Sequence, residues 1–113
     1  MSTLDLEDFA RDIHELNKAK GFYSAEGAKT PIQMAGKAML IVCEVAEMVE
    51  ELRKPAVEEG KVGFPAEVEE WADVMIRALD YAEARGFTAD GIQCMIAKTA
   101  YNRTRPARHG KLF

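Results

Sequence analysis

Two pairs of carboxylates, each with a spacing of three residues, are the groups in this sequence best suited to chemistry: Glu44 with Glu47, and Glu70 with Asp73. Side chains three residues apart lie on one face of a helix, and both pairs lie in stretches with helical apolar periodicity. If the two helices pack together, the four carboxylates meet. At about 5 Å and an effective dielectric of about 20, each charge pair repels by roughly 3 kcal/mol. A hard divalent cation relieves this repulsion, so the spacing predicts a site for Mg²⁺ or Mn²⁺.

The C-terminal part of the chain has the opposite charge. From residue 98 onward it carries no acid, although the whole chain has a net charge of −4. Such a segment suits an anionic ligand, or closes over an acidic site, whereas the net charge argues against a general nucleic-acid-binding surface. The basic residues are Lys98, Arg103, Arg105, Arg108 and Lys111.

Four helices, separated by glycine and proline, are predicted to position these groups. No stretch alternates with the period of a strand, and the connections are short. The sequence therefore predicts an all-α fold, an antiparallel helical bundle of about four helices, in one domain over 1–113 with a short basic tail from about 104. The helices are expected at 4–20 with Ser2 or Thr3 as cap, at 31–54 after the capping box of Thr30 and Gln33, at 65–85, and from a Thr88 cap to Arg105-Pro106.

The second helix is apolar on nearly every side except for one acidic line. Such a helix is buried on more than one side, which in a chain of this length favours an oligomer. On the third helix, Trp71 belongs to the expected core face, and Asp80 continues the acidic stripe, either in an ion pair with Arg77 or Arg103 or in support of the metal. The main apolar face of the second helix is expected to consist of Ala35, Ala38, Met39, Val42, Val45, Ala46, Val49 and Leu52.

The cysteines and the N-terminus indicate the cellular compartment of the protein. Cys43 and Cys94 show no metal-ligand spacing and lie in apolar helix stretches, so we expect two buried, reduced thiols and a cytoplasmic protein. The N-terminus lacks the apolar core of a signal peptide, and no apolar run approaches the roughly 20 residues of a membrane span.

The segments that carry these groups resemble the MazG-like nucleotide pyrophosphohydrolases of the all-α NTP pyrophosphatase superfamily. The pattern is E-x-x-E at 44–47, a spacer of 22 residues, E-x-x-D at 70–73, and then Lys98-x-x-x-Asn102-Arg103. The resemblance covers almost the whole chain. One difference is Cys43, which precedes Glu44 where several relatives have a second acid, and it leaves the number of metal ions and the general base open.

The resemblance implies that the four carboxylates bind Mg²⁺ and that the substrate is a nucleoside triphosphate, hydrolysed to a monophosphate and pyrophosphate in the removal of non-canonical or surplus (d)NTPs. The general base is expected to be Glu50 or Glu51, and Glu51 is the better placed of the two because it shares the face of Glu44 and Glu47. A homodimer or homotetramer is expected. The expected binding residues are Lys98 for the phosphates, Asn102 for sugar or phosphate, Arg103 and Arg105 (with Arg108) for the leaving pyrophosphate, and His14, Asn17, Phe22, Tyr23 and Gln33 for the base.

Two other functions fit the same residues. A phosphoribosyl-ATP pyrophosphatase shares the expected fold and differs in substrate. A non-enzymatic helical module would use the acidic stripe to bind a basic partner, because each E-x-x-E or E-x-x-D pair taken alone is also typical of a solvated helix face.

Overall fold

The computed structural model describes residues 4–24, 27–55 and 58–112, and over these residues it is all-helical. Its elements are α1 (Leu6–Ala19), α2 (Pro31–Leu52), α3 (Ala66–Ala84), α4 (Thr88–Arg103) and a final 3₁₀ turn, Ala107–Gly110. The four predicted helices are therefore confirmed. Within the described ranges no strand forms, and the pairing of Glu59 with Pro65 is an isolated bridge. No helix in the described part of the chain has the length and apolar character to span a membrane.

The start of α2 follows the predicted capping box. The Thr30 hydroxyl accepts a hydrogen bond from the Gln33 backbone N–H at 3.2 Å, and Gln33 Oε1 accepts one from the Thr30 N–H at 3.0 Å. Pro31 occupies the first helical position, where its missing N–H costs nothing. These contacts satisfy two of the backbone donors that a helix N-terminus leaves without partners.

Two other helix starts differ from expectation. The cap of α1 is Asp5, whose side chain accepts from the Asp8 N–H at 3.1 Å; the expected caps, Ser2 and Thr3, lie outside the described residues. The prediction of Thr88 as the cap of α4 is wrong, because Thr88 is the first helical residue and its hydroxyl donates to Glu83 at 2.7 Å. Phe87 takes the cap position instead. Local sequence places a helix start only to within a residue or two.

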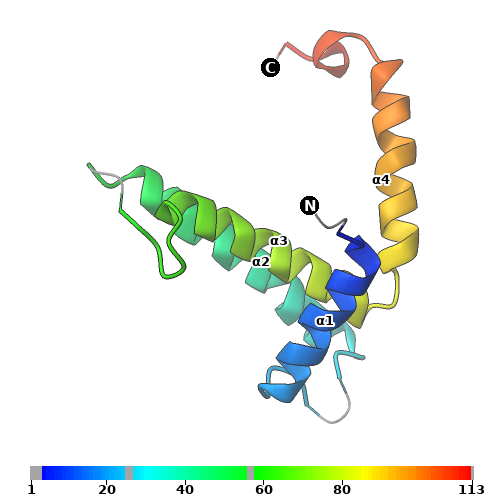
Figure 1. Ribbon diagram of the computed structural model, residues 1–113. Helices are drawn as coiled ribbons and strands as arrows, with labels where there is room; N and C mark the ends of the chain where they lie inside the picture. Colours follow the sequence, from blue (N-terminus) through cyan, green and yellow to red (C-terminus); the bar gives the residue numbers. More distant parts are fainter. Residues whose placement is uncertain (1–3, 25–26, 56–57, 113) are drawn as a thin grey trace.

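The central element is α3, which packs against α1 on one side and lies antiparallel to α2 on another (Figure 1). From the end of α3, α4 turns away, and its C-terminal half extends from the other helices as an arm (Figure 1). The radius of gyration is 16.7 Å, compared with about 13 Å for a compact domain of this length. The single chain is thus more open than a closed bundle.

The apolar faces of α2 and α3 point outward in the single chain, so the expected core face of α3 is not covered within it. Among the described residues the buried apolar side chains are Ala10 and Ile13 alone. Trp71, expected in the core, is 55% exposed. The large exposed apolar side chains of the two helices are Ile32, Met39, Val42, Val45, Val49 and Leu52 on α2 and Val68, Trp71 and Met75 on α3.

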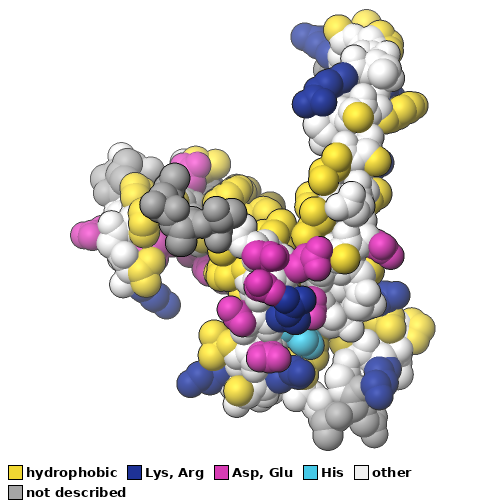
Figure 2. All heavy atoms as spheres, turned by 45° about the vertical axis from the view of Figure 1, so that its right-hand side comes forward, with side chains coloured by type: hydrophobic (Ala, Val, Ile, Leu, Met, Phe, Trp, Pro, Cys, Tyr) yellow, Lys and Arg dark blue, Asp and Glu magenta, His cyan; other side chains and the backbone are white. Residues whose placement is uncertain are grey.

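The reason for this inversion is that α2 and α3 turn their acidic stripes toward each other. Glu44 and Glu70, on the acidic stripes, are partly buried between the helices, while the opposite, apolar sides stay open. Figure 2 shows hydrophobic side chains along the α4 arm and on the neighbouring surface of the helix pair. Cys43 and Cys94 are free thiols as expected, but both are exposed, so their predicted burial is wrong for the single chain.

Candidate metal centre

Three of the four predicted metal ligands meet between α2 and α3. Glu44 and Glu47 come from α2 and Glu70 from α3, and one carboxylate oxygen of each lies within 4.8 Å of the others. The E-x-x-E spacing brings the two α2 carboxylates to one face, and antiparallel packing brings α3 alongside. Such a group of oxygen ligands matches what a hard divalent cation requires.

Asp73, the fourth predicted ligand, lines an open cleft of about 390 Å³ beside this group. Glu51, the predicted general base, lines the same cleft, and its Oε1 accepts a hydrogen bond from Lys54 Nζ at 2.9 Å. Among the lining residues, Lys61 is the one with a basic side chain. The lining acids are Glu47, Glu51, Glu58, Glu59, Glu69, Glu70 and Asp73.

Two oxygens of the centre lack a hydrogen-bond partner among the described residues. They are Oε2 of Glu44 and Oε2 of Glu70, and both are buried. The other Glu44 oxygen is 3.3 Å from Arg77 Nε, which donates to it. A buried oxygen without a partner costs about 1–3 kcal/mol. A cation held by these carboxylates would offer such oxygens a partner, so the residues present fit a divalent metal.

The electrostatics of the centre disfavour negative charge in the metal-free protein. Burial raises the pKa of Glu44 and the neighbouring Glu47 raises it further, while Arg77 acts in the opposite direction. Partial desolvation likewise raises the pKa of Asp73, followed by the charge of Glu44, against the lowering effects of Arg77 and Lys61. The raised pKa values mean that burial and neighbouring acids disfavour the charged carboxylates, and a bound metal would favour them.

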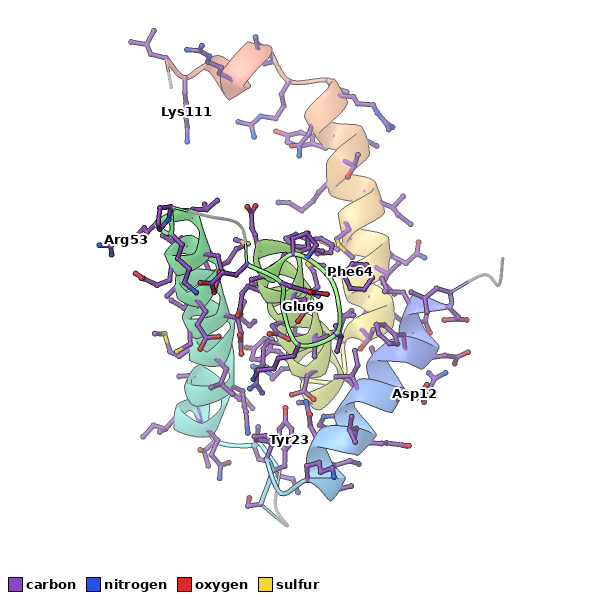
Figure 3. The ribbon with its side chains drawn as sticks, turned by 60° about the vertical axis from the view of Figure 1, so that its left-hand side comes forward. Asp12, Tyr23, Arg53, Phe64, Glu69 and Lys111 are labelled. Atoms are coloured by element: carbon purple, nitrogen blue, oxygen red, sulfur yellow. The ribbon has the colours of Figure 1, made fainter. Side chains whose placement is uncertain are left out.

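A second polar centre lies further along α3. Asp80 is 4% exposed, its Oδ1 is 2.9 Å from His14 Nδ1, and its Oδ2 accepts a hydrogen bond from the Tyr23 hydroxyl. These partners take the place of the ion pair with Arg77 or Arg103, which was one of the two alternatives predicted for Asp80. Burial and the hydrogen bond to Asp80 raise the pKa of Tyr23, which keeps it a neutral donor. Asp80 therefore holds α1 and the segment around Tyr23 (labelled in Figure 3) against α3.

Of the predicted base-binding residues, His14 and Tyr23 meet at this second centre and line a small pocket of about 110 Å³. The other three, Asn17, Phe22 and Gln33, are not among the described residues that line it. His14 commits one ring nitrogen to Asp80, and its ring meets Tyr23 edge-on with centroids 4.8 Å apart. Gln33 commits its side-chain oxygen to the cap of α2, and Asn17 is partly buried on α1. Phe22 is 50% exposed, with the Arg77 guanidinium 5.5 Å from its ring centroid. Of this set, Phe22 offers the most open ring.

The predicted phosphate-binding residues lie apart from the acidic cleft within one chain. Lys98, Asn102 and Arg103 are exposed on the outer half of α4, and Arg105 follows with its guanidinium 5.7 Å from the Tyr101 ring centroid. None of the four is among the residues described as lining the cleft. Because α4 turns away from α2 (Figure 1), a single chain does not join the basic set to the acidic one.

Glu69 and Lys61 were not singled out by the sequence, although both line the cleft. Little in the sequence identified them, because Glu69 only stands beside the predicted ligand Glu70 and Lys61 lies in a loop between Gly60 and Gly63. Comparisons with protein-family models, with curated proteins and with solved structures gave no match to this chain.

Proposed function

We propose that this chain is a Mg²⁺-dependent nucleoside triphosphate pyrophosphohydrolase, which converts (d)NTPs to monophosphates and pyrophosphate. The observation that carries the proposal is the meeting of Glu44, Glu47 and Glu70, two of which, Glu44 and Glu70, have a buried oxygen without a hydrogen-bond partner. An all-oxygen ligand set suits Mg²⁺, with Mn²⁺ as the substitute. The resemblance described above supplies the substrate class and the role, which is removal of non-canonical or surplus nucleotides in the cytoplasm.

Hydrolysis of a phosphoanhydride depends on positioning and on charge neutralisation. A bound cation supplies the neutralisation and lowers the pKa of a coordinated water. Glu44, Glu47 and Glu70 would hold this cation, with Asp73 as a further ligand on the cleft side. Glu51 lines the cleft, and its bond to Lys54 orients the carboxylate, so we assign to it the proton of the attacking water.

We also propose that the working form is a homodimer or a homotetramer. The chain exposes 8808 Å², whereas a folded monomer of this mass exposes about 6,200 Å². The excess is in the range that large, obligate interfaces bury. The outward apolar faces of α2 and α3 supply the surface for this interface, and in our proposal two copies pair these faces into one four-helix core.

In this oligomer we assign to the basic residues of α4 and the tail the binding of the triphosphate. In one chain they lie away from the cleft, so their access to a bound triphosphate depends on how the copies assemble. Lys98 and Asn102 are assigned to the phosphates and the sugar, and Arg103 and Arg105 to the leaving pyrophosphate.

The test is pyrophosphate release from a panel of common and damaged (d)NTPs, with Mg²⁺, with Mn²⁺ and with neither. We expect metal-dependent release, lost in Glu47→Gln and in Asp73→Asn while both variants keep the helical circular dichroism of the wild type. Glu15→Gln, at an exposed position of α1, is the matched control and should keep full activity. Turnover of phosphoribosyl-ATP alone would point to that pyrophosphatase instead, and no turnover with either metal would favour the interaction module.

A further inference from the structure

The carboxylate of Glu69 is enclosed by the loop that precedes α3. It accepts three backbone hydrogen bonds, from the N–H groups of Lys61 at 2.7 Å, Val62 at 2.8 Å and Phe64 at 3.1 Å. In Figure 3, Glu69 lies within the ring of this loop, close to Phe64. The loop also closes on itself, since the Gly60 N–H donates to the Phe64 carbonyl at 2.7 Å. We call residues 58–64 the Glu69 loop.

The Glu69 loop is shaped around this carboxylate. A Cβ atom at Gly60 would lie 2.2 Å from Glu69 Cδ, so any side chain there displaces the carboxylate. Gly63 has a φ of +90°, a conformation that favours glycine. Desolvation acts to raise the pKa of Glu69, but the hydrogen bonds from Val62, Phe64 and Lys61 outweigh it and lower that pKa. Glu69 is thus held as a charged anchor, with its carboxylate oxygens bound to the backbone of the loop.

The anchored loop forms one wall of the acidic cleft. Gly60, Lys61 and Glu69 line the cleft together with Glu70 and Asp73. Glu70 follows Glu69 directly, so adjacent residues of α3 serve two purposes: Glu70 contributes to the metal centre and Glu69 fixes the loop. Lys61 lines the same cleft as Asp73, and its positive charge acts in the direction that lowers the pKa of Asp73.

A triphosphate entering this cleft needs a basic contact from the protein. It carries about four negative charges, and the cleft itself is lined by acids. Cations held by Glu44, Glu47 and Glu70 neutralise only part of this charge. The basic residues of α4 and the tail lie elsewhere in the chain, whereas Lys61 is already on the cleft wall.

We propose that Glu69 is a positioning residue that holds the Glu69 loop against the cleft so that Lys61 contacts the phosphates of the bound ligand. This inference rests on the proposed function, because it assumes a polyphosphate ligand. It assigns no metal ligation to Glu69. The ammonium of Lys61 neutralises charge on the phosphates, and its position depends on the three backbone bonds to Glu69.

The experiment uses two probes, Mn²⁺ alone and inorganic triphosphate at saturating Mn²⁺, each titrated calorimetrically into the full-length protein. For Lys61→Met we expect triphosphate to bind about tenfold more weakly, while the Mn²⁺ dissociation constant stays within about twofold or falls, since a cation has been removed. Glu69→Gln and Gly60→Ala should show the same pattern without any change at Lys61. Lys20→Met, an exposed lysine at the end of α1, should leave both constants unchanged.

The outcomes separate this inference from the proposed function. If the wild type binds neither Mn²⁺ nor triphosphate, the proposed function fails and this inference fails with it. If the wild type binds both and Lys61→Met binds triphosphate as tightly, the inference alone is overturned. If Glu69→Gln and Gly60→Ala lower the melting temperature but keep wild-type triphosphate affinity, the Glu69 loop is structural only and the positioning role is wrong.

Discussion

Glu70 has a buried oxygen without a hydrogen-bond partner. One of its carboxylate oxygens lies within 4.8 Å of oxygens of Glu44 and Glu47. We therefore expect Glu70→Gln to raise the melting temperature of the metal-free protein by about 2–5 °C, since it removes one repelling charge and adds a donor. The same variant should lose the stabilisation that the wild type gains from Mg²⁺. Differential scanning fluorimetry with EDTA and with Mg²⁺ measures both effects. Glu15→Gln on α1 is the control, and a fall of several degrees for metal-free Glu70→Gln would show that basic side chains already pair this carboxylate.

The raised pKa of Glu44 gives the metal-free protein a characteristic pH dependence. A carboxylate whose pKa is higher in the folded than in the unfolded state contributes stability that is complete below its ordinary value, here 4.5, and that is lost as pH rises through the raised value. Asp73 acts in the same direction. Melting in EDTA should therefore occur at higher temperature near pH 5 than near pH 7.5, and the difference should shrink in Glu44→Gln.

The pKa of Glu69 is shifted in the opposite direction to that of Glu44, so Glu69 affects stability at lower pH. Its pKa is lowered in the folded state, so its contribution is present above the ordinary value of 4.5 and is lost as pH falls through the lower, folded value. Glu69 therefore does not compete with Glu44 between pH 5 and pH 7.5. A stability profile in EDTA that rises steadily from pH 5 to pH 7.5, with the same slope in Glu44→Gln, would contradict a raised pKa of Glu44 in the folded protein.

At the level of the elements, the capping box of α2 gives a test that separates structure from binding. Gln33 was predicted both as a capping residue and as a base contact, and the structure places its side-chain oxygen on the Lys29 and Thr30 N–H groups. We expect Gln33→Ala and Thr30→Ala each to destabilise the protein by about 1 kcal/mol, measured by chemical unfolding. A rise in KM for the nucleotide in Gln33→Ala but not in Thr30→Ala would restore a binding role for Gln33.

The helices illustrate which features local sequence determines. The Thr30 cap and the E-x-x-E and E-x-x-D faces depend on residues three or four apart, so the sequence predicted them and the structure shows the cap and the meeting of the two acidic faces. Contacts between distant residues were not accessible in this way. Asp80 pairs with His14 across 66 positions, and Glu69 anchors a loop whose path no short pattern specifies.

Local sequence also could not predict which face of α2 points inward. Its apolar residues surround the acidic line on nearly all sides, so periodicity alone allowed either the apolar or the acidic face to meet α3. The structure turns Glu44 toward α3 and leaves Val42, Val45 and Val49 exposed. That choice depends on α3 and, by our proposal, on a second copy of the chain.

For the whole molecule, the exposed apolar faces of α2 and α3 give the last prediction. Light scattering after size exclusion should report a dimer or a tetramer at micromolar concentration for the wild type. Val45→Glu, near the middle of the exposed α2 face and 38% exposed in the single chain, would place two like charges across the paired copies, which costs several kcal/mol at an interface. We expect it to shift the protein to monomer or to aggregate, with loss of melting cooperativity.

The control for the interface is a charge added away from it. Ala19→Glu, at the exposed last residue of α1, adds the same acid outside the apolar faces and should keep the wild-type mass. If Val45→Glu keeps both the mass and the melting temperature, the α2 face is not the interface. If the wild type is a stable monomer, the openness of the chain belongs to the protein itself, and Lys98 and Asn102 of α4 would have to reach the cleft by movement of their own arm.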